Sequence, residues 1–458
     1  MNRKRRIKNL DLLAKRLKKW RRVLLQQRLM LVGIAAILIV AAGIGLFTGL
    51  SGCQSQPATP PPRVAVAATV GSIKTEPMVR IRIVRDAAIV QIQSRGELQV
   101  GAPNAQTSSQ LRTLGKSLRV SLEAGQYRLE PIAGQSLNWQ IPTLTVKAAN
   151  NQPIQINGKT FHGTIWIHRK TSSAGQVIDI VNHVPLETYL PGVLAKELYP
   201  KWHRETFRSQ AIAARSYAIN NLTNSRRRHY DMENTQASQA YIGITNNSTA
   251  LQAVRDTRGL VLAYNNEIVT AYYSSSCGGV GQDATAIVPN EKRIPPLLGK
   301  QRGDWCKESS LYRWRVVRNR QTLSKRIALW GAAHGYSVKG IGVITQITAS
   351  ENNQAGRPTK FQLSDTEGKR FELRSTSLRT ALNFGPKGWQ KIERPHMVRS
   401  SHIAITFTGN NIVIQGAGFG HGVGMCQYGA QAMAKKGYQA QGILSFYYPQ
   451  SEMRRAYK

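Results

Sequence analysis

The sequence predicts an α+β fold, mainly antiparallel β with a few helices, preceded by one N-terminal transmembrane or lipoprotein-signal helix. Three observations support this prediction. Short runs of alternating apolar and polar residues fill 78–183, and helical spacing begins only after residue 184. The 22 uncharged residues 29–50 follow a basic N-terminus.

The 458 residues carry a strong positive charge, with 63 Lys+Arg against 24 Asp+Glu and a formal net charge of +39. Residues 1–28 contribute twelve Lys/Arg and one Asp, a net +11, so 39 minus 11 leaves +28 for the rest. A basic chain favours an anionic partner, which is nucleic acid, acidic lipid or an anionic wall polymer.

The N-terminal residues narrow this choice. Residues 29–50 are long enough to span a bilayer at ~1.5 Å per residue. The basic segment 1–28 is expected to be cytoplasmic, which places the bulk of the chain on the periplasmic or cell-wall side of the membrane. This topology argues against nucleic acid as the partner.

The anchor segment 29–53 ends in Leu-Ser-Gly-Cys53, which has the shape of a bacterial lipobox. Cys53 is therefore either lipidated after cleavage or a plain thiol at the membrane exit, and both alternatives stay open. Residues 54–77 are rich in Pro, Ala and polar residues, as expected of a semi-extended linker.

The remaining elements follow in order along the chain. A β-rich N-terminal region covers residues 78–150, and strand-like runs continue to residue 183. Two helices are predicted next, in "VPLETYLPGVLAKELYP" and "RETFRSQAIAARSYAINNL". A hairpin with its turn at Asn265-Asn266, a helix around 321–334, and a closing helix "GAQAMAKKG" ended by Gly437 complete the chain.

Asp and Glu are scarce in this chain, so we considered each one as a possible catalytic residue. Glu197 lies in "VLAKELYP", a largely apolar segment in which partial desolvation would raise its pKa and make it a general acid near neutral pH. The alternative is a surface ion pair with a neighbouring cation, and spacing alone favours that alternative.

Four further stretches concentrate polar groups. Each has a purely structural alternative, which is helix packing, a solvated connection, a serine-rich turn or a crowded glycine turn. The candidate binding residues in these stretches are Arg215, Ser216, Asp231, Thr235, Gln239, Ser274, Ser275, Ser276, Gly278, Gly279, His421, Gln427 and Tyr428.

Three cysteines, Cys277, Cys306 and Cys426, follow the anchor. In an oxidising compartment one disulfide with one thiol left over is plausible. No CxxC or HxxxH spacing occurs, so the sequence predicts no metal site, and no cofactor is expected.

Taken together, the motifs resemble the SpoIID/LytB family. They occur in the order of that family, cover roughly residues 155–450, and define an expected domain over 151–450. They read "YLPGVLAKELYPKW" (189–202), "FRSQAIAARSYA" (207–218), "DMENTQASQAYIG" (231–243), "YYSSSCGG" (272–279) and "GFGHGVGMCQYGA" (418–430).

The resemblance implies action on peptidoglycan. The sporulation member is a lytic transglycosylase that cleaves MurNAc–GlcNAc bonds of peptide-stripped glycan strands and leaves 1,6-anhydroMurNAc ends. Its catalytic acid matches Glu197, so the resemblance favours a catalytic role for Glu197 over the surface ion pair that spacing alone favoured. Asp231 is a candidate orienting partner. LytB-type members imply the alternative, a non-catalytic glycan-binding enhancer of an N-acetylmuramoyl-L-alanine amidase.

Some positions depart from the family or stay ambiguous. Cys277 and Cys426 replace residues that are usually small, so a 277–306 disulfide competes with a 277–426 one. Some clostridial relatives bind zinc through Cys and His in the loop matching 231–243, but this loop has neither residue. His421 either contacts a sugar with Gln427 and Tyr428 or pins the glycine turn.

Overall fold

The computed structural model describes residues 68–105, 110–173, 175–225, 228–236, 238–288, 290–386 and 388–458. The basic segment, the anchor and Cys53 lie outside these residues, so the predictions made for them stay predictions. Within the described ranges, no helix combines the length and apolarity needed to cross a bilayer.

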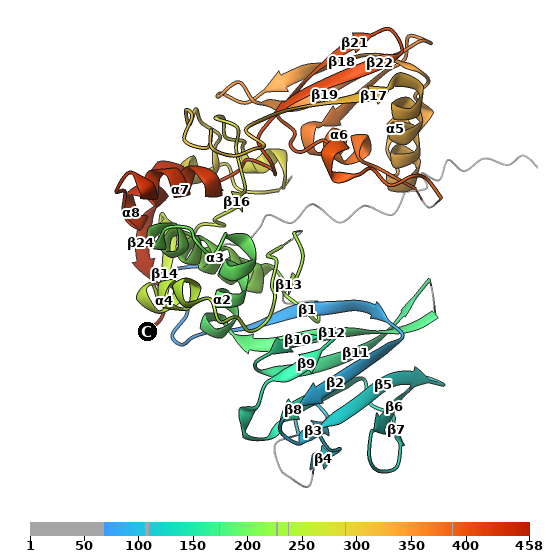
Figure 1. Ribbon diagram of the computed structural model, residues 1–458, viewed down its shortest axis with the longest axis vertical. Helices are drawn as coiled ribbons and strands as arrows, with labels where there is room; N and C mark the ends of the chain where they lie inside the picture. The colour runs from blue at the N-terminus through green and yellow to red at the C-terminus, as the bar shows by residue number, and fades with distance from the viewer. Residues whose placement is uncertain are drawn as a thin grey trace, which may run out of the picture. The chain divides into compact units, whose positions relative to one another are not determined.

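The fold is α+β with mostly antiparallel strands, as predicted (Figure 1). Among the described residues two strand pairs are parallel. These are β1 (Met78–Ala87) with β13 (Met232–Glu233), and β16 (Tyr273–Ser274) with β23 (Met425–Cys426).

Two sheets form the N-terminal β region. The first has the order β13-β1-β12-β11-β8-β3-β4, with β12 (Gly175–Pro185), β11 (Thr164–Ser172), β8 (Thr143–Ala148), β3 (Leu98–Gly101) and β4 (Arg112–Thr113). The second has the order β10-β9-β2-β5-β6-β7, with β10 (Lys159–Phe161), β9 (Ile154–Ile156), β2 (Ile89–Ser94), β5 (Ser117–Glu123), β6 (Gln126–Pro131) and β7 (Leu137–Trp139).

Both sheets contribute to one hydrophobic core. Side chains alternate between the two faces of a strand, and the inward-facing ones meet in this core. They include Val79 and Ile81 of β1 and Val90 and Ile92 of β2. No break occurs at residue 150, because β8 pairs with β11 across it in the first sheet. The expected β-rich region and the start of the following domain are therefore parts of the same sheets.

The same core extends into a helical layer. It comprises α2 (Leu186–Glu197), α3 (Arg204–Asn224) and α4 (Ser248–Asp256), next to the sheet of β15 (Glu267–Ile268), β14 (Leu260–Tyr264) and β24 (Glu452–Arg455). The hairpin turn falls where predicted, with Asn265 and Asn266 at φ 49° and 62°. Helices α7 (Gln427–Lys435) and α8 (Ala440–Tyr447) pack against α3.

Residues between 313 and 417 add two further small sheets with a core of their own. The sheets are β17 (Arg313–Asn319), β22 (Asn411–Ala417) and β21 (Ile403–Thr408), and β18 (Ile344–Asn352), β19 (Pro358–Asp365) and β20 (Arg370–Arg374). Helix α5 (Arg320–His334) lies where the sequence predicted it, whereas α6 (Ser375–Leu382) was not anticipated.

The C-terminal part of the expected linker is packed rather than free. The amide of Ala68 donates to Asn220 Oδ1 at 2.9 Å, and the amide of Val70 donates to the carbonyl of Asn266. These hydrogen bonds hold residues 68–70 against α3 and the hairpin, because a buried backbone amide needs a partner.

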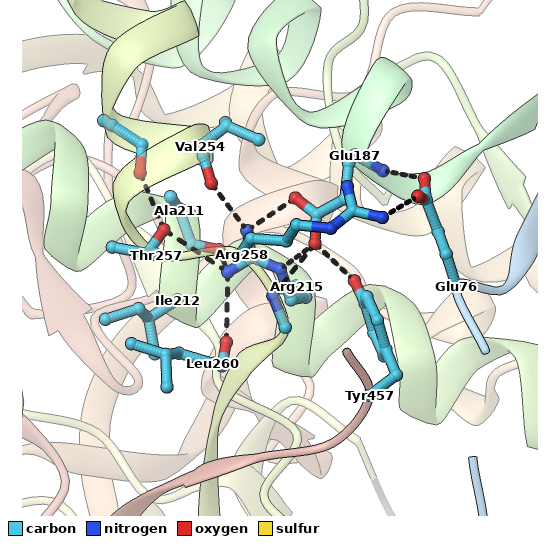
Figure 2. A network of polar contacts seen from close by, with 12 residues as sticks. Glu76, Glu187, Ala211, Ile212, Arg215, Val254, Thr257, Arg258, Leu260 and Tyr457 are labelled. Atoms are coloured by element: carbon cyan, nitrogen blue, oxygen red, sulfur yellow. Dashed lines mark hydrogen bonds and ion pairs between the residues drawn. The ribbon is translucent and has the colours of Figure 1, made fainter. Parts of the chain in front are cut away.

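One buried ion pair joins α2 to α3 (Figure 2). Arg215 Nε and Nη2 donate to the two carboxylate oxygens of Glu187 at 2.9 and 2.8 Å. The Arg215 side chain is fully buried and that of Glu187 is 8% exposed. The Tyr457 hydroxyl and the Gly259 amide also donate to Glu187, at 2.5 and 3.1 Å.

The remaining guanidinium hydrogens of Arg215 point at backbone oxygens. Its Nη1 donates to the carbonyl of Leu260 at 3.0 Å, and its Nη2 to that of Val254 at 3.4 Å. The pair is therefore almost completely hydrogen-bonded, which is the condition under which a buried charge pair is tolerated. Arg215, a residue predicted to contact substrate, thus lies in the network that holds the helical layer together.

We predict that Arg215→Ala lowers the free energy of unfolding by about 3–5 kcal/mol, because it leaves the Glu187 carboxylate buried and unpaired. Arg258 offers a matched control, since it pairs with Glu76 in the same network but is 46% exposed. Arg258→Ala should cost less than about 1 kcal/mol. Denaturant unfolding of the two full-length variants checks this, and equal losses would contradict it.

Candidate active site

A cavity of about 610 Å³ lies beside the C-terminal end of α2. Segments far apart in the sequence form its wall, from α2 and α3 to β16, α6, and the glycine loop 416–424. Its polar and aromatic lining includes Glu197, Tyr217, Asn220, Asn221, Tyr272, Tyr273, Ser274, Ser275, Glu291, Arg379, His421 and Gln427. The size suits a ligand of several rings or sugar units.

Glu197 is the last residue of α2 and is half-buried at the cavity wall. The Ala240 amide donates to its Oε1 at 3.2 Å, and Gln427 Nε2 donates to its Oε2 at 3.3 Å. Burial raises the pKa of Glu197 despite these two donors and Lys196, which favour the ionised form. Its position at the negative end of a helix dipole acts in the same direction as burial.

Loop 231–243 holds the Ala240 donor in place by packing tightly on α2. A Cβ added at Gly192 would lie 2.1 Å from the carbonyl oxygen of Gly243 and 2.7 Å from the Tyr241 ring. The glycine in "YLPGV" therefore allows the helix and the loop to touch. This close approach is what brings a backbone amide within reach of Glu197.

The glycine loop packs its backbone on the serine-rich segment. Strand β23 pairs in parallel with β16, in the register Tyr273↔Met425 and Ser274↔Cys426. Gly424 has φ +63°, and a Cβ there would lie 1.9 Å from the carbonyl oxygen of Tyr272. The glycines thus serve contact between two backbone segments, which places Gln427 opposite Glu197.

His421 lines the cavity but is tied to its own loop. Its Nδ1 accepts the Val423 amide at 3.0 Å, and its ring also bonds to the backbone of Tyr273. Burial lowers the pKa of His421 to about 4, with further lowering by Arg357 and Arg379. The imidazole is therefore neutral at pH 7. The sequence allowed His421 either to contact a sugar or to stabilise the glycine turn, and these contacts favour the second role.

A second carboxylate reaches the cavity from a region outside the motifs. Glu291 accepts the Tyr272 hydroxyl at 2.5 Å. The Tyr272 ring packs edge-on against Tyr217 and His421. This part of the cavity wall is therefore an aromatic surface with one hydrogen-bonded acid.

Arg379, on α6, brings a positive charge to the cavity. Burial lowers its pKa, and within the described part of the chain it has no carboxylate partner at ion-pair distance. A partly desolvated guanidinium without a counter-ion is suited to binding an anionic ligand group.

Three aromatic rings gather at the surface beside Glu197 and Gln427. Tyr199, Trp202 and Tyr428 lie with ring centroids 5.1–6.3 Å apart, and Tyr199 is 59% exposed. Tyr428, a predicted binding residue, is thus part of an aromatic cluster. Such rings offer flat apolar faces with polar edges, which suit the faces of sugars.

The structure brings some of the predicted residues to the cavity and leaves others elsewhere. Glu197, Ser274, Ser275, His421 and Gln427 line it. Gln239 lies just behind, where its Nε2 donates to the Tyr273 hydroxyl at 3.1 Å and to the Ala214 carbonyl. Its contacts make it a positioning residue.

Ser216 and Asp231 have structural partners in place of a ligand. The Ser216 hydroxyl accepts the Leu262 amide at 2.9 Å. Asp231 is buried, pairs with Arg80 at 2.6 Å, and accepts the Ser225 hydroxyl. Neither is among the residues that line the cavity.

The other predicted residues surround the serine-rich segment and its neighbouring loop. Thr235 is exposed, and its carbonyl accepts the Ser238 amide. Ser276 is buried, and its backbone pairs with Phe419. Gly278 and Gly279 face the backbone of Ala417 and Gly303 and are not among the lining residues.

Sequence reasoning missed several lining residues. Tyr272 and Tyr273 stood inside a quoted motif, and their place beside the serines could have drawn attention to them. Glu291 and Arg379 lie in stretches without a motif, so no local signal identified them.

The three cysteines do not form the expected disulfide. Cys277, Cys306 and Cys426 are all free and buried. The Sγ atoms of Cys277 and Cys306 are 3.8 Å apart, well beyond the ~2.05 Å of a disulfide bond. Cys426 lies beside them, since its Sγ accepts the Cys277 amide at 3.3 Å.

Comparison with known families gives two matches. The model of a family described as "Stage II sporulation protein" matches residues 174–264, which contain α2, α3 and β14. A "Domain of unknown function (DUF8618)" matches residues 245–424, which include α5, α6 and the whole glycine loop.

Individual relatives agree with the first match. A stage II sporulation protein D of Bacillus subtilis is 26% identical over 294 residues, 60% of this chain and 76% of that protein. An amidase enhancer of Bacillus subtilis is 26% identical over 364 residues, 73% of this chain but only 49% of that protein. An uncharacterized protein of Brachyspira hyodysenteriae is 29% identical over 295 residues, 64% of this chain and 72% of that protein. The family model and the named relatives therefore support the resemblance of this chain to the SpoIID/LytB family.

Proposed function

We propose that this protein is a peptidoglycan lytic transglycosylase that cleaves MurNAc–GlcNAc bonds of peptide-stripped glycan strands. The observation that carries the proposal is the protonatable carboxyl of Glu197. Its pKa is raised by burial, and it lies at the wall of a cavity large enough for sugar units. A raised pKa makes a carboxyl more suited to act as a general acid than an ordinary glutamate.

In the first step Glu197 donates its proton to the glycosidic oxygen. The C1–O bond of MurNAc breaks, and positive charge develops on the ring as an oxocarbenium-like state. The leaving GlcNAc keeps the proton as a hydroxyl group. The Ala240 and Gln427 donors then stabilise the carboxylate that Glu197 has become.

In the second step the Glu197 carboxylate takes the proton of the MurNAc 6-hydroxyl. The oxygen of that hydroxyl attacks C1 of MurNAc and closes the 1,6-anhydro ring. No water is consumed, and Glu197 returns to its acid form. One carboxyl thus serves as acid and then as base.

Arg379 supports the choice of peptide-stripped strands. Removal of the stem peptide from MurNAc leaves a free lactyl carboxylate, which an unpaired guanidinium in the cavity can bind. A strand that still carries its peptides presents a neutral amide there. The exposed cluster of Tyr199, Trp202 and Tyr428 supplies a surface on which further sugars stack.

The proposed substrate sets the location. A chain anchored by residues 29–50, with its bulk outside the cytoplasm, would reach the wall from the membrane, whether or not Cys53 is lipidated. The excess of positive charge suits an anionic wall.

The second candidate function is a non-catalytic one. The relative named amidase enhancer favours a glycan-binding module that stimulates a cell-wall amidase. In that case the cavity binds the strand without cutting it, and the partner amidase performs the only chemistry.

The products formed by the wild type and by the Glu197→Gln variant distinguish the enzyme from the non-catalytic enhancer. We expect the wild type to release anhydro-ended fragments from peptide-free strands, and Glu197→Gln to be slower by about 10²–10⁴-fold, the usual contribution of a general acid–base group. Mass spectrometry of the products checks this. Binding without fragments from either protein would overturn the enzyme proposal and leave the amidase enhancer.

Glu291→Gln is the matched control, because Glu291 is the other carboxylate on the cavity wall. A transglycosylase that uses Glu197 alone should still produce only anhydro ends in this variant. Reducing ends made by the wild type and lost with Glu291→Gln would instead indicate hydrolysis by two carboxylates.

Gln427→Met should change the pH dependence. Gln427 favours the ionised form of Glu197, so its loss raises the pKa further and keeps the acid protonated to higher pH. The alkaline limb of kcat/KM should move up by about one to two units, since a hydrogen bond to a charged group is worth about 1.5–3 kcal/mol. A limb that stays or moves down would show that another group limits the rate.

Arg379→Gln should remove the preference for peptide-stripped strands. The ratio of kcat/KM for stripped over peptide-bearing strands should fall about tenfold or more, equivalent to ~1.4 kcal/mol. Arg374→Gln is the control, because Arg374 precedes α6, is exposed and is not among the lining residues of the cavity. An unchanged ratio in Arg379→Gln would exclude this role.

A further inference from the structure

The cysteine cluster formed by Cys277, Cys306 and Cys426 is a second group of reactive side chains that the proposed mechanism does not use. Each comes from a different segment, namely the end of the serine-rich segment, the 300–312 loop, and β23. Their three Sγ atoms all lie within 4.8 Å of one another, and all three residues are buried.

The spacing of the sulfurs suits one shared ion. Two thiolates bound to a single tetrahedral Zn²⁺ at about 2.3 Å are about 3.8 Å apart. The Cys277 and Cys306 sulfurs lie 3.8 Å apart. A disulfide would use two of the three cysteines and leave the third without a role.

The charges around the cluster point to an anionic centre. Arg302 is 3% exposed and Arg357 is fully buried. Neither makes an ion pair with a carboxylate anywhere in the described ranges. Arg357 Nη1 donates to the Cys277 carbonyl at 3.1 Å, whereas its Nε and Nη2, and Arg302 Nε, have no hydrogen-bond partner.

Two buried cations without a counter-ion are costly. Three neutral thiols, or a disulfide and a thiol, would leave that charge uncompensated. Three thiolates on a monovalent ion carry two negative charges, which the two guanidinium groups neutralise, and on a divalent ion they carry one. The buried Tyr447 hydroxyl, also without a hydrogen-bond partner, is a further donor beside the sulfurs.

We propose that Cys277, Cys306 and Cys426 bind one soft metal ion, Cu⁺ or Zn²⁺, through three thiolate sulfurs. Thiolates prefer such ions over hard ones such as Mg²⁺ or Ca²⁺. The site lies behind the cavity, since Cys426 directly precedes Gln427 and Ser274–Ser276 directly precede Cys277. The ion therefore ties β23, which leads into Gln427, to the end of the serine-rich segment.

The spacing of nearby residues predicted no metal site, because Cys306 and Cys426 follow Cys277 by 29 and 149 residues. Such a site arises only when three segments meet. It is distinct from the loop 231–243, which contains neither cysteine nor histidine.

The test uses the full chain in detergent, prepared and kept under reductant, and loaded separately with Cu⁺ and with Zn²⁺. After gel filtration, elemental analysis should find one ion per chain for at least one of the metals. The three thiols should resist alkylation until a chelator is added. Cys306→Ser should weaken binding by at least about tenfold, as even second-shell changes can. Cys53→Ser, which removes the remaining cysteine, should leave the stoichiometry unchanged.

A readout on the wild type alone covers the case in which Cys306→Ser fails to fold. Co²⁺ substitution of the reduced full chain should produce the intense thiolate-to-metal absorption of a sulfur-ligated ion. Absence of that band together with no bound Cu⁺ or Zn²⁺ would overturn the proposal. A disulfide among the three cysteines in chain isolated without reductant, with no metal bound, would also overturn it.

Discussion

The site depends on the buried pair of Arg215 and Glu187. Glu187 is near the start of α2 and Glu197 is its last residue, so the pair fixes one end of the helix whose other end carries the proposed acid. Because both charges are desolvated and hydrogen-bonded, their geometry has little freedom. The pair therefore determines where Glu197 can lie, although neither residue is at the cavity wall.

The second constraint is backbone contact between the glycine loop and the serine-rich segment. The parallel pairing of β16 and β23 places the first residue of α7, Gln427, against Glu197. A side chain at Gly424 would separate the two segments and move that amide away. High glycine content in this loop is thus explained by packing between parts of the protein, and the polar side chains that follow it supply the chemistry.

Much of the fold could be predicted from the sequence because its signals are local. Alternation located the strands of 78–183, and the Asn265-Asn266 pair located a turn. Glu197 and Gln427 were found through motifs. Arg379 and Glu291 were not, because they enter the cavity from segments whose sequence has no distinctive spacing. The buried ion pair of Arg215 could not be predicted either, since a cation in a motif can hold the fold as easily as a ligand.

The contact between Glu197 and Gln427 spans 230 residues of sequence. A chain made from its N-terminus presents the acid long before the amide that steadies its conjugate base exists. α6 and the glycine loop, which also line the cavity, are made after Glu197 as well, and α7 follows them. The order of synthesis by itself therefore leaves the candidate site incomplete until almost the whole chain has been made.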